Sequence, residues 1–223
     1  MERIICLVIG YVFGLFQTAF IYGKAHGIDI RQHGSGNSGT TNALRVLGKK
    51  AGLIVFLGDV LKTVLAMVIC RLLFQNSAPQ MLPLLSLYAG TGVILGHNFP
   101  FYMKFKGGKG IAATAGLVTA FDWRFMLVAL VLFCMAFFLT NYVSLGSLLV
   151  YAGFMVELVV FGQLGKFQMS RNLVYELYVL GAFLTIMAYV KHRENIKRLL
   201  KGEERKTYLH KKNKEEINSE KDA

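Results

Sequence analysis

Apolar residues in this 223-residue chain occur in long runs, and this pattern restricts the fold more than any other feature. Hydrophobic residues make up 54% of the sequence. A run of about 18 or more apolar residues predicts a transmembrane helix, because roughly 20 helical residues cross the hydrocarbon core of a bilayer. We therefore expect an all-α, polytopic membrane protein. Its spans are predicted at about residues 3–22, 52–74, 83–98, 111–121, 125–140, 144–161 and 173–190.

Seven spans is the number we favour, although the fourth predicted span is short. Residues 111–121 can cross a bilayer only if the helix starts in the preceding basic loop or the bilayer thins locally. A five-span interpretation would make this region re-entrant structure. The first apolar run has neither the basic start nor the small-residue cleavage site of a signal peptide, so we expect it to be retained as a span.

The basic residues are distributed unevenly, and their distribution predicts the orientation of the chain. The sequence has 25 Lys and Arg against 13 Asp and Glu, a net charge of +12. Most of the basic residues fall in two inter-helix loops and in the tail from Lys191 onward. Because cytoplasmic loops carry an excess of Lys and Arg, we expect an outside N-terminus and a cytoplasmic C-terminus. This topology accounts for the net charge without a nucleic-acid partner.

A polar stretch, GSGNSGTTNALRVLG from Gly34 to Gly48, interrupts the apolar pattern. Three glycines are expected to take positive φ and to turn their N–H groups toward a ligand: Gly34, Gly36 and Gly39. Thr40 or Thr41 is predicted to cap a short helix that ends at Gly48 and carries Arg45. A helix start beside a guanidinium is typical of a phosphate site. A mobile turn with an orientation-setting arginine would give the same pattern.

A second glycine-rich stretch, GHNFPFYMKFKGGKGIAAT, runs from Gly96 to Thr114. It combines three lysines with three glycines just before a predicted helix: Lys104, Lys106, Lys109, Gly107, Gly108 and Gly110. A topology signal would explain the lysines, but it does not explain three glycines in four positions. We therefore favour a second phosphate-binding loop.

The remaining polar residues lie in the tail and inside the predicted spans. By charge alone, the tail stretch HRENIKRLLKGEE from His192 to Glu204 fits a solvated amphipathic helix. Asp59 and Lys62 stand three residues apart in a predicted span, where ionisable groups are expensive. We interpret Asp59, Lys62 and His97 as structural support near the site. We expect a membrane domain over residues 1–206 and a polar, disordered cytoplasmic tail over residues 207–223.

Together these stretches resemble the bacterial integral-membrane acyl phosphate:glycerol-3-phosphate acyltransferases. The resembling motifs run from Gly34 to Gly48, from Gly96 to Ala113 and from His192 to Glu204, with the linker YVSLGS between the last two. The resemblance implies a seven-helix transmembrane bundle with a cytoplasmic-face active site. It implies acyl transfer from acyl phosphate to the 1-hydroxyl of glycerol 3-phosphate, which gives lysophosphatidic acid, the first intermediate of phospholipid synthesis. Membrane lipid is a further expected partner, and no metal or cofactor is implied.

The resemblance also implies roles for individual residues, by their position in the motifs. Catalytic roles fall on Ser35, Arg45, His192, Asn195 and Glu204. Substrate-binding roles fall on Gly34, Gly36, Asn37, Gly39, Thr41, Asn42, Lys104, Gly107, Gly108, Lys109, Gly110 and Ser144.

The chemistry of an acyl phosphate is consistent with this set of residues. Such a mixed anhydride is already activated, and the sequence has no Ser-His-Asp order. We favour substrate-assisted catalysis, in which a phosphate oxygen takes the hydroxyl proton, with His192 as the alternative base. A small-anion transporter is a competing interpretation, but its binding groups should lie near the membrane midplane. A non-catalytic lipid-binding scaffold would not need two phosphate loops.

Overall fold

The computed structural model describes residues 1–208, and within this range it contains helices and no strand. The predicted all-α class is therefore confirmed. The α-helices are α1 (Glu2–Gly14), α2 (Thr18–Ala25), α3 (Thr40–Leu47), α4 (Lys49–Phe74), α5 (Leu82–Asn98), α6 (Ile111–Phe121), α7 (Trp123–Thr140), α8 (Val143–Gln163), α9 (Arg171–Lys191) and α10 (Arg193–Lys201). Single 3₁₀ turns form at Ile30–Gln32, Pro79–Met81 and Phe101–Met103.

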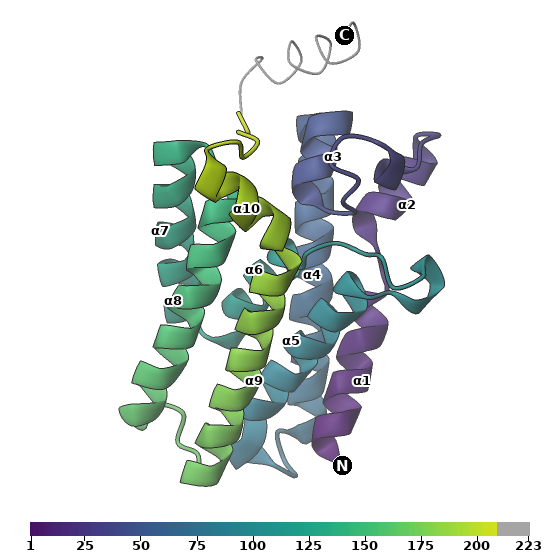
Figure 1. Ribbon diagram of the computed structural model, residues 1–223. Coiled ribbons are helices and arrows are strands. Elements are labelled where there is room, and N and C mark those ends of the chain that lie inside the picture. The colour runs from purple at the N-terminus through teal and green to yellow at the C-terminus, as the bar shows by residue number, and fades with distance from the viewer. Residues whose placement is uncertain (209–223) are drawn as a thin grey trace, which may run out of the picture.

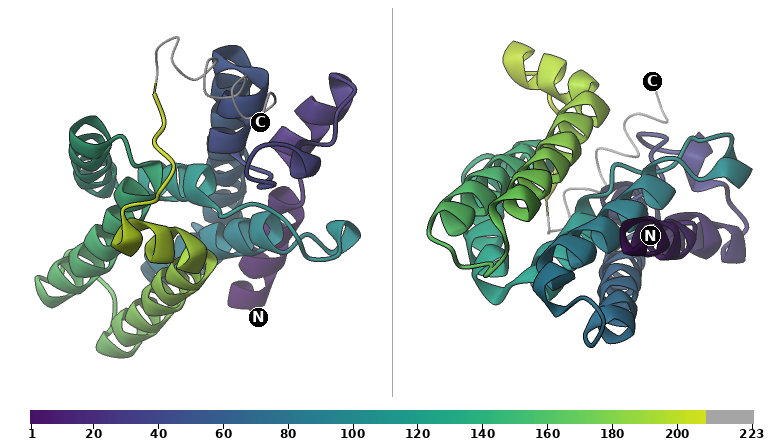
Figure 2. Two further views of the ribbon diagram at one scale, coloured as in Figure 1. Left: turned by 45° about the horizontal axis from the view of Figure 1, so that its top comes forward. Right: turned by 90° about the horizontal axis from the view of Figure 1, so that it is seen from below.

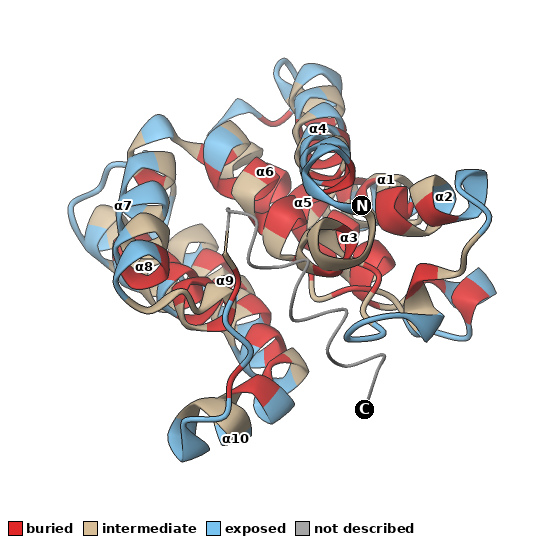
Figure 3. Ribbon diagram, turned by 90° about the horizontal axis from the view of Figure 1, so that it is seen from above, coloured by how far each residue is buried: buried red, intermediate tan, exposed pale blue. Residues whose placement is uncertain are grey.

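Five segments of the described chain are long and apolar enough to cross a membrane: Glu2–Ala25, Lys49–Phe74, Trp123–Thr140, Val143–Gln163 and Arg171–Lys191. The other two predicted spans form helices that are shorter, with 17 residues in α5 and 11 in α6. Much of the outer surface of α4 and α7 is exposed and apolar, including Leu57, Leu61, Leu130 and Leu139. Figure 3 shows the buried residues facing inward between the helices. Apolar side chains on the outside of a bundle are what contact with lipid requires.

The first predicted span is wrong in one respect, because its helix is interrupted between Gly14 and Thr18. Side chains bind the backbone carbonyls that the interruption frees, and the Gln17 side chain within it also bonds the end of α5. The Gln17 amide donates to the carbonyls of Gly14 and His97, and the Lys62 ammonium donates to the Phe16 carbonyl at 2.7 Å. Inside a membrane protein, a helix break persists only where such partners satisfy the backbone.

Helices α1 and α5 approach each other through paired glycines. A Cβ on Gly10 would lie 2.0 Å from the Ala89 carbonyl oxygen, and one on Gly14 would lie 2.3 Å from the Val93 carbonyl oxygen. Gly92 and Gly96 of α5 are equally close to the backbone of α1. Small residues four apart allow this backbone contact between membrane helices. The contact fixes the end of α5, from which the second glycine-rich loop departs.

Helices α2, α3 and α10 lie toward the end of the molecule opposite the N-terminus, and the loop between α5 and α6 lies below them, nearer mid-height (Figure 1). Helices α7, α8 and α9 stand together as one group, while α1, α4 and α5 form another (Figure 1). The short α6 lies between the groups and contacts α4, α5 and α7. Helix α10 turns away from the axis of α9 and lies across that end of the bundle (Figure 2). Contacts of the α5–α6 loop with Ser38 and with Asn195 of α10 bring all three predicted motifs together.

Candidate active site

Asn42 of α3 holds the first glycine-rich loop in shape. Its buried amide nitrogen donates to the carbonyls of Ile30 and His33, and its oxygen accepts from the Ser35 N–H at 2.8 Å. Gly34 takes φ +60, and a Cβ at this position would lie 2.4 Å from the Asn42 oxygen. Glycine is therefore required there by both backbone conformation and space. The loop presents Ser35 at an exposed position.

The predicted backbone of this loop is confirmed at two glycines and wrong at the third. Gly36 has φ +68, but Gly39 is extended at φ −149 and serves as the N-cap of α3. The predicted threonine cap is wrong, because no side chain caps this helix. A Cβ on Gly39 would lie 2.9 Å from the Asn37 side-chain oxygen, the one close neighbour of this position. The predicted helix end at Gly48 is confirmed.

The second glycine-rich loop is bound to the end of α5. The Gly107 N–H donates to the Asn98 carbonyl, and the Gly108 N–H donates to the His97 carbonyl. Both amides are therefore bonded within the protein, and the substrate-binding role of Gly107 and Gly108 stays a prediction. The last carbonyls of α5 have no partner within the helix, and the loop supplies one. Gly110 has φ +78 and begins α6, as predicted.

The two glycine-rich loops touch each other beside His97. A Cβ on Gly108 would lie 2.1 Å from His97 Nε2 and 2.9 Å from the Ser38 carbonyl oxygen. The Ser38 hydroxyl and the Asn98 side-chain amide are buried here without a hydrogen-bond partner among residues 1–208. Buried polar groups are nearly always bonded in folded proteins, so these atoms keep hydrogen-bonding capacity that the described residues do not use.

A buried carboxylate, Glu204, is the centre of the third motif. Its oxygens accept hydrogen bonds from Ser144 Oγ at 3.0 Å, Asn195 Nδ2 at 2.7 Å and Arg198 Nε at 2.8 Å. Lys109 of the second loop donates to the Asn195 side-chain oxygen. The structure thus brings together residues from the α5–α6 loop, α8, α10 and the segment after α10.

Lys109 and His192 share this half-buried environment. Burial lowers the pKa of Lys109 to about 8, although the Glu204 carboxylate acts in the opposite direction. Burial, followed by the positive charge of Lys109, lowers the pKa of His192 to about 4. His192 Nδ1 lies 2.8 Å from the Ala188 carbonyl oxygen. A carbonyl only accepts, so Nδ1 carries the proton and Nε2 of the neutral ring has a free lone pair.

Arg45 reaches from α3 to the segment that follows α10. Its Nη2 donates to Thr207 Oγ1 at 2.6 Å and to the Arg205 carbonyl at 3.2 Å. Thr207 is 1% exposed, and its N–H donates to the Asn141 carbonyl. The predicted boundary at residue 206 is therefore too early, because Thr207 packs with the site. Residues 209–223 of the predicted tail lie outside the described residues.

The remaining predicted substrate-binding residues differ in their burial. Asn37 and Thr41 are half-buried in the first motif, whereas Lys104 is exposed at the outer turn of the second loop. In residues 1–208, no group of three His, Cys, Asp or Glu side chains is arranged to hold a metal ion.

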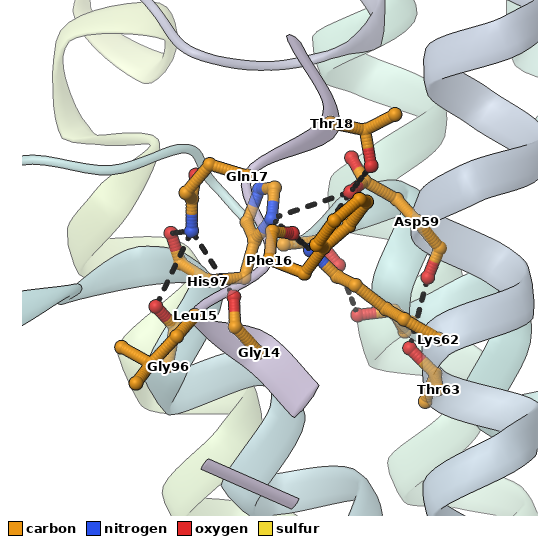
Figure 4. A network of polar contacts seen from close by, with 12 residues as sticks. Gly14, Leu15, Phe16, Gln17, Thr18, Asp59, Lys62, Thr63, Gly96 and His97 are labelled. Atoms are coloured by element: carbon orange, nitrogen blue, oxygen red, sulfur yellow. Dashed lines mark hydrogen bonds and ion pairs between the residues drawn. The ribbon is translucent and has the colours of Figure 1, made fainter. Parts of the chain in front are cut away.

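The predicted support residues form one buried polar network (Figure 4). Lys62 Nζ lies 2.8 Å from Asp59 Oδ1 and 3.0 Å from His97 Nδ1. Thr18 Oγ1 of α2 donates to the same Asp59 oxygen. The predicted pairing of Asp59 with Lys62 is confirmed. A buried charge is tolerated when it is paired and hydrogen-bonded, and this pair joins α4 to α2 and to the end of α5.

Residues 4–202 match the family described as glycerol-3-phosphate acyltransferase. The chain belongs to this family. A glycerol-3-phosphate acyltransferase of Thermoanaerobacter sp. (strain X514) is 38% identical over 207 residues, which cover 92% of this chain and 96% of that protein. One from Exiguobacterium sibiricum is also 38% identical, over 97% of this chain and 98% of its own.

Two solved structures share the fold of this family member. The glycerol 3-phosphate form of PlsY, an integral membrane glycerol 3-phosphate acyltransferase, is 30% identical with a TM-score of 0.79, over 93% of this chain and 96% of its own. Its lysophosphatidic acid form is 29% identical with a TM-score of 0.77, over 94% and 97%. The protein is accordingly a multi-pass membrane acyltransferase of phospholipid synthesis.

Sequence reasoning missed three polar groups of this glycerol-3-phosphate acyltransferase: Ser38, Asn98 and Thr207. Ser38 and Asn98 lie inside the two glycine-rich motifs, so their position was a usable signal. Nothing local distinguishes Thr207 from its neighbours in a charged tail, because its contacts are with Arg45 and Asn141 far away in the sequence.

Proposed function

We propose that this chain transfers a fatty acyl group from acyl phosphate to the 1-hydroxyl of glycerol 3-phosphate, releasing lysophosphatidic acid and phosphate. The observation that carries the proposal is the meeting of the two glycine-rich loops at Ser38, Gly108 and Asn98, with cations on the adjacent segments. Lys109 and Arg45 lie close enough for the charge of Arg45 to lower the Lys109 pKa. PlsY, with which the chain shares its fold, has been solved with glycerol 3-phosphate and in a lysophosphatidic acid form.

Charge is the main requirement that such a site must meet. Two phosphorylated substrates bring roughly four negative charges near neutral pH. Arg45, Lys104 and Lys109 would neutralise part of this charge, and the Ser38 and Asn98 side chains would satisfy phosphate oxygens. Fixed donors around the reacting carbonyl also stabilise the charge that develops in the transition state. In this proposal Ser35 and Arg45 contact the reacting groups.

The reaction requires one bond to form and one to break. The 1-hydroxyl oxygen bonds to the acyl carbonyl carbon, the bond from that carbon to the phosphate oxygen breaks, and the hydroxyl proton passes to a phosphate oxygen. A base with a pKa near the working pH is the most effective. The pKa of about 4 makes His192 a weak base, whereas a phosphate monoester titrates near roughly 6. This comparison supports substrate-assisted catalysis, with His192 accepting a hydrogen bond at Nε2.

The Glu204 cluster has a positioning task in this scheme. Asn195 connects Lys109 to Glu204, and Ser144 connects Glu204 to α8. The carboxylate therefore holds the lysine-bearing loop against α10. Asn42, Asp59, Lys62 and His97 act further from the substrate by shaping the loops.

We place this site at the cytoplasmic face of a seven-span bundle, with the N-terminus outside. The first and third motifs lie toward the end opposite the N-terminus (Figure 1), and the Lys109–Asn195 contact joins the second motif to the third, which supports a shared face. In this topology α5 and α6 are the two short spans, buried between longer helices. The excess of Lys and Arg in the loops at this end supports the orientation.

A donor comparison tests the proposed reaction. Purified protein in lipid is incubated with radiolabelled glycerol 3-phosphate and either acyl phosphate or acyl-CoA. We expect labelled lysophosphatidic acid with acyl phosphate alone, because no sequence feature resembles a nucleotide site. We also expect a chelator to leave the rate unchanged. Turnover with acyl-CoA, or passage of glycerol 3-phosphate into vesicles without acylation, would contradict the proposal.

A further inference from the structure

Residues 203–207, which follow α10, form a non-helical segment that we call the C-terminal strap. Figure 2 shows the strap leaving the end of α10. It contains Glu204, which the family resemblance marks, and Thr207, which no motif includes. Both residues are buried, although they lie in a highly charged stretch of sequence.

The strap is fixed at two points that are three residues apart. Glu204 accepts bonds from Ser144, Asn195 and Arg198. Thr207 donates its N–H to the Asn141 carbonyl at 2.9 Å, at the turn between α7 and α8. With both ends held, the strap has a defined backbone position relative to α8 and α10.

Arg45 is bound to this fixed strap. Nη2 donates both to the Thr207 hydroxyl at 2.6 Å and to the Arg205 carbonyl at 3.2 Å. A guanidinium is a planar fork, so fixing one nitrogen with two acceptors restricts the orientation of the whole group. A long arginine side chain otherwise has many rotamers, and a substrate would have to order them on binding.

We propose that Thr207 is a positioning residue for Arg45, holding its guanidinium ready for a substrate phosphate. This inference rests on the proposed function, in which Arg45 contacts a phosphate. The strap then links the third motif to the first. Glu204 sets the position of the strap, and Thr207 sets the orientation of Arg45. Neither the hydroxyl nor the N–H of Thr207 needs to touch the substrate.

Three variants of the full chain test this role. Thr207→Val removes the hydroxyl and keeps the shape, Thr207→Ser keeps the hydroxyl, and Thr207→Ala is a second deletion should the valine fail to fold. The control is Thr140→Val, the same change at the same turn, whose hydroxyl bonds Ala136 and Tyr142. The readouts are kcat and KM for both substrates, the inhibition constant of inorganic phosphate, and Tm.

We expect Thr207→Val to lower kcat/KM roughly tenfold, as for loss of a hydrogen bond to a charged group. Most of that change should be in KM for one phosphorylated substrate, with a parallel rise in the inhibition constant of phosphate. Thr207→Ser should restore wild-type constants. Thr140→Val should lower Tm without changing KM.

Two results would overturn the inference while leaving the proposed function intact. Thr207→Val and Thr207→Ala with wild-type constants would show that Arg45 needs no help from the strap. Faster turnover in these variants would show that Thr207 competes with the substrate for Arg45. A wild-type protein that makes no lysophosphatidic acid would contradict the proposed function, and this inference with it.

Discussion

Arg45 differs from the loop lysines in geometry rather than in charge. Its planar guanidinium can be held by the strap through Nη2 while its other N–H groups point in fixed directions, whereas a lysine ammonium is a point charge. Arg45→Lys should therefore keep the charge but lose roughly ten- to a hundredfold in kcat/KM, the effect of breaking a charge-assisted bond. The kcat/KM of Ser35→Ala should also be much lower than that of wild type in the acyl transfer assay, and Arg45→Ala should be almost inactive.

Lys50 provides the matched control for these substitutions. It is an exposed cation a few residues after Arg45, just past the end of α3. Lys50→Ala should be nearly silent in the same assay. If Lys50→Ala lost activity while Arg45→Lys kept it, the first motif would be acting as a diffuse basic surface.

Lys109 should give the reaction an alkaline limit. Because burial lowers its pKa to about 8, the ammonium is lost as pH rises through that value. We expect kcat/KM for glycerol 3-phosphate to fall above that pH, and Lys109→Arg to abolish the fall. The substrate phosphate has a pKa of about 6 in the assays of both wild type and Lys109→Arg, and it provides an internal reference. If kcat/KM of Lys109→Arg fell at the same alkaline pH as in wild type, the fall would have to come from another group.

Among the structural elements, the α5–α6 loop depends most on its lack of side chains. A Cβ on Gly108 would meet both His97 Nε2 and the Ser38 carbonyl, so both glycine-rich loops would have to move. Gly108→Ala should lower kcat/KM at least tenfold and should also lower Tm, since an overpacked site costs roughly 1–3 kcal/mol. Kinetics and thermal unfolding of the purified variant would check both effects.

Gly165→Ala separates backbone strain from obstruction. Gly165, in the loop between α8 and α9, has a positive φ that Gly108 lacks, and a Cβ there has open space around it. We expect it to lower Tm slightly without changing kcat/KM. If Gly108→Ala kept the kcat/KM of wild type, as expected for Gly165→Ala, the α5–α6 loop would have a role in topology alone.

The helices were predictable because their apolar runs are local signals, and the predicted ranges match α4 to α9 closely. The interruption between Gly14 and Thr18 was not predictable, since its partners, Lys62 and the end of α5, come from other helices. Each motif was visible alone, but the Lys109–Asn195 and Arg45–Thr207 contacts that join them were not.

At the scale of the whole molecule, the proposed topology puts all three motifs on one side of the membrane. Single cysteines in place of Lys50, Lys106 and Lys166 would test it, after Cys6, Cys70 and Cys134 are replaced by alanine. We expect an impermeant maleimide to label the first two positions only from the cytoplasmic side. The third, between α8 and α9, should be labelled only from outside. Labelling of all three from one side would contradict the topology.

The central claim is that three distant segments form one acyl transfer site. The most direct measurement is the rate of lysophosphatidic acid formation from acyl phosphate and labelled glycerol 3-phosphate, with phosphate release followed in parallel. In both wild type and Lys50→Ala, the amount of phosphate released should equal the amount of lysophosphatidic acid formed. One variant from each segment, Arg45→Ala, Lys109→Ala and Asn195→Ala, should each be at least tenfold slower, the effect of losing a charge-assisted contact. No product from wild type, or full activity in any one of the three variants, would contradict the account.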